Sequence, residues 1–165
     1  MIGAAMLRPQ TFEEVEHDPS STIQAAMVVL IVAVATGIGR LGSGVEGMSS
    51  GVGVFIGGVI VGLIGWAFWA WITYFIGTRL PRDQDTHADW GQLARTLGFA
   101  QSPGIFKVFG VVPGVGQTIF VIAAIWQLVA MVMAIRQALD YTSTWRAIGV
   151  ALVGFIPYII FQALV

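Results

Sequence analysis

The run GMSSGVGVFIGGVIVGLIGWAFWAWITYFIGT, residues 47–78, contains no charged side chain. A helix over residues 51–77 is expected to be about 40 Å long, which exceeds the ~30 Å of hydrocarbon in a bilayer. The second half of this helix carries Trp66, Trp69 and Trp71, and such residues gather where a helix enters the lipid headgroups. The run therefore predicts a transmembrane helix that is tilted or that protrudes at one end.

Three further uncharged runs are long enough to cross a bilayer: residues 19–39, 108–135 and 147–165. The whole chain is 56% hydrophobic and only 10% charged, compared with roughly 25% charged residues in soluble domains. Its mean hydropathy is +0.82. These numbers predict an all-α protein, a polytopic transmembrane helical bundle without a separate soluble domain.

We predict five spans and a short N-terminal tail. The tail covers residues 1–22, and Thr11 is expected to be the N-cap of a short interfacial helix that lays Phe12 and Val15 on the membrane. The transmembrane bundle covers residues 23–165, and its spans are expected at about 23–40, 51–77, 91–112, 117–138 and 146–164.

The third segment is the ambiguous one. Arg95 and Lys107 interrupt its apolar residues, and Pro103-Gly104 is expected to kink or break any helix there. The segment is either a kinked span or a re-entrant pair of half-helices of the kind that surrounds transporter sites. We favour the kinked span, because the sequence shows no inverted repeat that would pair with it.

The basic residues distinguish the two topologies. With five spans, six of the eight basic residues fall on the side of the N-terminus, and only Arg40 and Lys107 fall on the other. The six are Arg8, Arg79, Arg82, Arg95, Arg136 and Arg146. Four spans and a re-entrant loop would leave a weaker bias of five against three. Since basic residues concentrate on the cytoplasmic side, we predict five spans, a cytoplasmic N-terminus and a C-terminus outside.

Glycines at four-residue intervals mark candidate helix-packing positions on the second span. They form GxxxG spacings, which let helix backbones approach closely in lipid, and the candidates are Gly53, Gly57, Gly58 and Gly62. Packing inside the bundle is the favoured interpretation, and contact with a second copy or another subunit is the alternative. The GxGxxG pattern at residues 37–42 lacks the strand and helix of a dinucleotide site.

A second candidate is a contact cluster at the cytoplasmic ends of the spans, formed by Arg95, Arg136, Asp140 and Arg146. Arg136 and Asp140 are four residues apart at the cytoplasmic end of the fourth span, so an ion pair is expected there. Such charges usually cap helix ends and reach the headgroups. The alternative is a recognition surface for a cytoplasmic partner.

The sequence offers no pattern typical of catalysis. None of the predicted spans has Asp, Glu or His at mid-membrane depth, where proton relays and pumps need them. We expect Gln127, the deepest polar residue, to hydrogen-bond a neighbouring helix. The chain has no cysteine and only two histidines, far apart, so neither a metal nor a cofactor is expected. The net charge of −1 argues against nucleic acid as a partner.

Several short stretches resemble the prokaryotic branch of the Yip family. They are Leu97-Gly98-Phe99-Ala100-Gln101-Ser102-Pro103-Gly104, Ala134-Ile135-Arg136-Gln137-Ala138-Leu139-Asp140-Tyr141, Thr144-Trp145-Arg146-Ala147-Ile148 and the N-terminal Leu7-Arg8-Pro9 with Phe12-Glu13-Glu14-Val15 and Pro19. The resemblance implies a five-span bundle with a cytoplasmic N-terminus, in the inner membrane of a prokaryote. Eukaryotic members are adaptors that bind Rab-type GTPases, but their Tyr-Gly-Pro signature and long cytosolic domain are absent here.

The residues leave two functions of different class open. The favoured one is a non-catalytic scaffold or accessory subunit that packs against other membrane proteins, for example in an energy-transducing complex. The alternative is a small transporter or lipid-handling protein that uses the kinked third span. Membrane lipids are expected partners of either.

Overall fold

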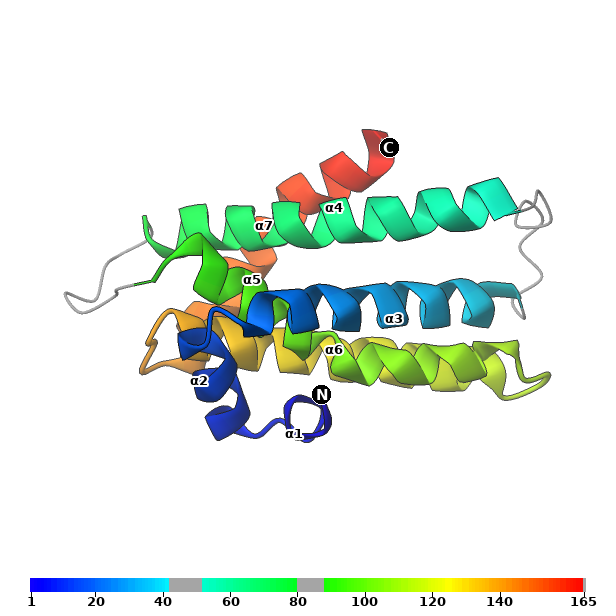
Figure 1. The fold of residues 1–165 in the computed structure, drawn as a ribbon, viewed down its shortest axis with the longest axis horizontal. Coiled ribbons are helices and arrows are strands. Elements are labelled where there is room, and N and C mark those ends of the chain that lie inside the picture. Colours follow the sequence, from blue (N-terminus) through cyan, green and yellow to red (C-terminus); the bar gives the residue numbers. More distant parts are fainter. Residues whose placement is uncertain (42–51, 80–87, 165) are drawn as a thin grey trace.

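The computed structural model describes residues 1–41, 52–79 and 88–164, and every regular element in those ranges is helical. The predicted all-α class is thereby confirmed for this part of the chain. In chain order the elements are α1 (Ile2–Ala5), α2 (Pro9–His17), α3 (Ser21–Leu41), α4 (Val52–Gly77), α5 (Trp90–Ala100), the 3-10 helix η1 (Ser102–Val111), α6 (Gly116–Ala138) and α7 (Thr144–Leu164). The long helices lie side by side along one axis, and α7 leans away from it (Figure 1).

The outer surface of the bundle is apolar. On α4, Ile56, Ile60 and Ile64 recur every four residues, and each is 51% exposed. Three helical stretches are long and apolar enough to cross a bilayer: Ser21–Leu41, Ile56–Gly77 and Gly116–Ala138. The stretch Thr144–Ile160 of α7 is apolar but shorter. Exposed aliphatic stripes are unfavourable in water and favourable in lipid, so the architecture is that of an integral membrane protein.

Glycine lets three backbones meet where α3, η1 and α6 pack together. A Cβ on Gly39 would collide with the backbone carbonyl of Lys107, and a Cβ on Gly110 would lie 2.7 Å from the carbonyl oxygen of Gly39. Gly116 is held in the same way against the carbonyl of Gly110. In lipid, where apolar burial gives little drive, such close approach supplies the packing energy. Gly39, the second glycine of the GxGxxG pattern, is thus a packing residue; Gly42 lies outside the described residues.

The third predicted span changes helix type in its middle. The α-helix α5 ends at Ala100, and η1 begins two residues later with Pro103 in its first turn. Proline lacks the N–H that would continue the α-helical pattern, which explains the break at this point. Both α5 and η1 pack on α3 and α6, so together they follow these two helices. A Cβ on Gly104 would lie 2.6 Å from Cγ1 of Val32, so η1 has no room for a side chain there.

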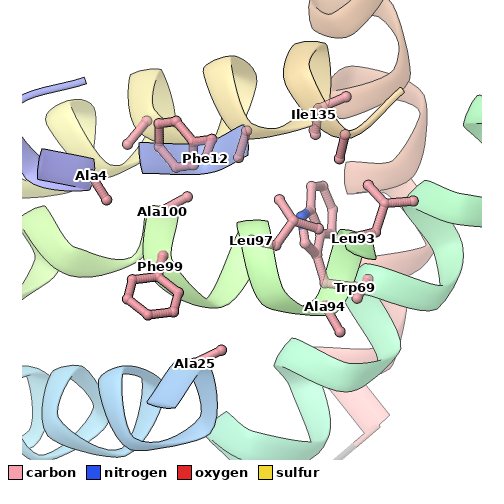
Figure 2. Packing of buried hydrophobic residues seen from close by; sticks show 14 of the residues in the cluster. Ala4, Phe12, Ala25, Trp69, Leu93, Ala94, Leu97, Phe99, Ala100 and Ile135 are labelled. Atoms are coloured by element: carbon pink, nitrogen blue, oxygen red, sulfur yellow. The ribbon is translucent and has the colours of Figure 1, made fainter. Parts of the chain in front are cut away.

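The N-terminal helix α2 packs its apolar side chains against the rest of the protein. Phe12 is fully buried and Val15 is buried beside it, in one cluster with Leu97 and Ala100 of α5 (Figure 2). The expectation that Phe12 and Val15 lie on the membrane was therefore wrong. The cap was wrong as well: the helix begins at Pro9, whose fixed φ suits the first helical position, and not after Thr11.

Candidate functional site

A buried arginine joins α2 to the bundle at one end, which we name the α2 end. Arg95, on α5, is 8% exposed, and its Nε donates to the carbonyl oxygen of Val15 at 3.0 Å. Its Nη2 donates to the carbonyl oxygen of Glu16 at 2.5 Å. The last carbonyls of a helix have no partner within the helix and carry its negative dipole end, so a guanidinium is well suited to them. Arg95 thus caps α2 from another helix.

The position of Arg95 is fixed by the start of its own helix. Asp89 is the N-cap of α5, and its carboxylate accepts from the backbone N–H of Gln92 at 2.9 Å. The Gln92 side chain accepts from the Asp89 backbone N–H at 2.7 Å, which completes a capping box. The box sets where α5 begins, and Arg95 follows in the second turn of the helix.

A buried carboxyl group lies next to this cap. Glu16 is only 4% exposed, and burial, together with the nearby charge of Asp140, raises its pKa from 4.5 to about 7. The positive charges of His17 and Arg95 act in the opposite direction. Its neighbour His17 has a raised pKa, first because its ring contacts the Glu13 carbonyl oxygen and then because of Glu16. Glu16 therefore changes charge near neutral pH.

The turn between α6 and α7 is organised by Arg136. Its guanidinium donates to the carbonyl oxygen of Tyr141 at 3.2 Å and to Oγ1 of Thr144 at 3.2 Å. The Tyr141 hydroxyl donates to the carbonyl oxygen of Gly77 at 2.7 Å, which ties the turn to the end of α4. Asp140 has a left-handed φ of 51° at this turn. Arg136 thus holds the turn between α6 and α7.

A shallow pocket opens beside this turn. Its volume is about 310 Å³. Pro9 of α2 and the α6–α7 region form its wall: Met133, Arg136, Gln137, Asp140, Tyr141 and Thr142. Gln137 also donates to the Glu13 carboxylate at 2.9 Å, so α2 and α6 are connected at the rim. The pocket offers hydrogen-bonding groups of both charges and some apolar surface, which suits a peptide segment or a polar headgroup.

The residues of the predicted contact cluster do not form a single group. Arg136 and Asp140 line the same pocket. Arg95 is linked to them only by charge: Arg95 and Asp140 both act on the pKa of Glu16, in opposite directions. Arg146 is exposed near the start of α7. Glu16 and Gln137 were not predicted as residues of the site. The acidic stretch from Glu13 to Asp18 is the sequence signal that could have indicated a carboxylate close to the bundle.

The predicted helix-packing glycines differ in their surroundings. A Cβ on Gly62 would lie 3.4 Å from Cβ of Ala33 on α3, an ordinary contact inside the bundle. A Cβ on Gly57 or Gly58 would meet nothing within 4 Å in the described part of the chain. Gly53 belongs to α4, but its surroundings lie outside the described residues. Contact of this face with another helix stays a prediction.

A half-buried polar pair lies near the predicted kink. Lys107 of η1 donates from Nζ to Oε1 of Gln127 at 2.5 Å, and its ammonium is 5.6 Å from the centre of the Phe120 ring. Gln127 is near the middle of α6. The expectation that Gln127 hydrogen-bonds a neighbouring helix is confirmed. Lys107, which the five-span topology counts on the side away from the N-terminus, extends its side chain toward the middle of α6.

Among the described residues, no three His, Cys, Asp or Glu side chains lie close enough to hold a metal ion. Comparison with known proteins adds one finding. The model of a family described as the Yip1 domain matches residues 4–164. No curated protein and no solved structure was found to match the chain.

Proposed function

Since the chain belongs to the Yip1 domain family, we propose that it is a membrane scaffold that crosses the bilayer five times. In this proposal it is non-catalytic, lies in the inner membrane of a prokaryote, and presents its α2 end to the cytoplasm. The N-terminus lies on that side, and the C-terminus lies on the opposite side.

Two observations support five spans. First, α5 and η1 together pack along both α3 and α6, as a crossing segment should. Second, Lys107 is engaged with Gln127 inside the bundle and is not a loop charge. Without Lys107, the other seven basic residues divide six to one in favour of the α2 end, which is a stronger bias than the six-to-two division expected from the sequence.

A fusion experiment tests the topology. A reporter that is active only outside the cytoplasm is fused after Val165, and a second fusion is placed before Met1. We expect activity from the C-terminal fusion alone. Activity of a cytoplasmic reporter at Val165 would contradict five spans.

The pocket at the α2 end is the observation that carries the scaffold role. Arg136 and Asp140 present opposite charges there, and the surrounding wall is held rigid by the hydrogen bonds of Arg136 and Tyr141. Rigid, polar surfaces of this kind lose little entropy when a partner binds. The partner would be another membrane protein with a segment that reaches this face.

Purification in mild detergent with chemical cross-linking tests the partner. We expect a larger assembly with wild type and its loss with Arg136→Ala. The milder variant Gln137→Ala removes one pocket side chain and leaves the turn intact, and Arg8→Ala is the control, because Arg8 is exposed and does not line the pocket. Recovery of only monomer or homodimer from wild type would overturn the scaffold proposal.

The alternative function, a small transporter or lipid-handling protein, is favoured by one observation. A lysine paired with a glutamine near mid-bundle is costly in lipid, and such groups often mark a path for a substrate. In proteoliposomes, movement of a labelled lipid or anion that depends on Lys107 would favour this alternative over the scaffold. Loss of movement in Lys107→Met at unchanged thermal stability is the decisive result.

A further inference from the structure

The lipid-facing surface of α4 changes character along its length. In the half away from the α2 end it presents the isoleucines at positions 56, 60 and 64. In the half near the α2 end it presents aromatic rings: Phe68, Trp71 and Phe75 stack in sequence. The ring centroids are 6.2 Å apart for the first pair and 5.7 Å apart for the second, with interplanar angles of 20° and 26°. One half of this helix surface is therefore a ladder of nearly parallel rings.

A guanidinium completes the ladder at the α2 end. Cζ of Arg79 lies 3.9 Å from the centroid of the Phe75 ring, so the arginine folds back over the helix toward the membrane. Arg79 is exposed, and Trp71 and Phe75 are 51% and 41% exposed. A guanidinium that stacks on a ring keeps its N–H donors at its edge, where they can bind oxygen atoms.

The length of the ladder matches one leaflet of the bilayer. From Phe68 to the end of α4 at Gly77 the helix rises about 14 Å at ~1.5 Å per residue, close to half of ~30 Å of hydrocarbon. A phospholipid molecule fits both features of this surface. Its phosphate can pair with a cation at the headgroup level, and its acyl chain can pack on rings along the hydrocarbon layer.

An aromatic side chain from α5 lies beside the ladder. The indole N–H of Trp90 points to the carbonyl oxygen of Ala67 at 3.4 Å, and Trp90 is 42% exposed. In an α-helix this carbonyl also accepts from the amide of residue 71, so Trp90 lies next to the Trp71 turn. Trp90 of α5 thus contacts the backbone of α4 next to the ladder.

We propose that the Phe68–Trp71–Phe75–Arg79 surface is a binding site for one anionic phospholipid in the leaflet at the α2 end. The Arg79 guanidinium binds the phosphate oxygens through charge-assisted hydrogen bonds, and one acyl chain lies along the three rings. This inference needs the bundle to lie in a bilayer, but it does not depend on the scaffold role or on a partner protein.

Native mass spectrometry of the full-length protein tests the site. The protein is released from detergent after titration with phosphatidylglycerol or with phosphatidylcholine. Wild type is expected to retain phosphatidylglycerol with an apparent affinity at least about tenfold above that of the Arg79→Gln variant, because the phosphate contact is charge-assisted. Arg8→Gln is the matched control, since it removes an exposed arginine away from the ladder.

Two additional arms separate this site from general attraction to lipid. Trp71→Leu keeps the charge and removes the central ring, and it is expected to weaken retention of phosphatidylglycerol without changing thermal stability. Inorganic phosphate, added in excess, is expected not to displace the lipid. Equal retention of phosphatidylglycerol by wild type and Arg79→Gln, equal retention of both lipids by wild type, or displacement by inorganic phosphate would each overturn the proposal.

Discussion

Replacing Arg95 by methionine should loosen α2 from the bundle. The substitution keeps an unbranched apolar stem in the buried position and removes both hydrogen bonds to the carbonyl oxygens of Val15 and Glu16. Hydrogen bonds that involve a charged group contribute ~1.5–3 kcal/mol each. The lower bound for the pair is about 3 kcal/mol, which corresponds to a roughly hundredfold rise in the ratio of undocked to docked α2.

The apolar contacts of α2 limit this effect. Complete removal of a buried phenylalanine side chain costs ~3–5 kcal/mol, and Phe12 is fully buried here. Since Phe12 and Val15 remain in place in the variant, α2 should stay docked on average and open more often. The predicted result is local opening of one helix, while the long helices keep their stability.

Amide hydrogen exchange measures this opening directly. Peptides that cover α2 are expected to exchange up to ~100-fold faster in Arg95→Met, while peptides from α3 and α6 should be unchanged. Arg8→Met is the control, because it removes an exposed arginine just before the same helix. Unchanged exchange of α2 in Arg95→Met would refute the capping role assigned to Arg95.

Three further predictions concern pH and packing. A fluorophore on Glu14→Cys, in a chain without native cysteine, should report undocking of α2 as pH rises from about 5 to 8. The pKa of Glu16 is raised to about 7 when α2 is docked, so protonation of Glu16 favours docking. The charged groups that act on Glu16 are Asp140, His17, Arg95 and Glu13. Glu16→Gln should reduce this dependence to the smaller part that comes from the raised pKa of His17, and an undiminished dependence would contradict the role of Glu16. Phe12→Ala should lower the midpoint of thermal unfolding, since the loss of the buried ring lowers the free energy of unfolding by ~3–5 kcal/mol. Gly104→Ala should destabilise the protein by at least ~1 kcal/mol, because its Cβ would collide with Val32 and Gln127, whereas Gly58→Ala should be neutral in the same assay.

The long helices could be predicted from the sequence because a lipid bilayer imposes a simple requirement. A segment must be apolar for about 20 residues, and this alone places α4 at Val52–Gly77 where the sequence predicted 51–77. In the same way α6 runs Gly116–Ala138 where a helix was predicted over 117–138. Proline likewise marked where α5 gives way to η1.

The candidate site was harder to predict from the sequence, because its contacts join residues that are distant in the chain. Arg95 was singled out by its charge, but its acceptors are backbone carbonyls some 80 residues earlier, and a carbonyl has no signature in a sequence. Phe12 and Val15 show an apolar stripe, which fits a membrane surface and a protein surface equally well. The partner of Lys107 was missed for a related reason: a long flexible side chain reaches a partner away from its own backbone position.

The bond between Arg95 and α2 also sets an order of assembly. Helix α2 is synthesised first, but the arginine that caps it follows about 80 residues later, after two long apolar helices have entered the membrane. The N-terminal helix must therefore wait undocked, with its apolar side chains uncovered, until α5 is in place. A chain truncated before residue 95 would carry all of α2 and both helices and still be unable to close this end. Docked α2 therefore requires that the chain has been made at least as far as α5.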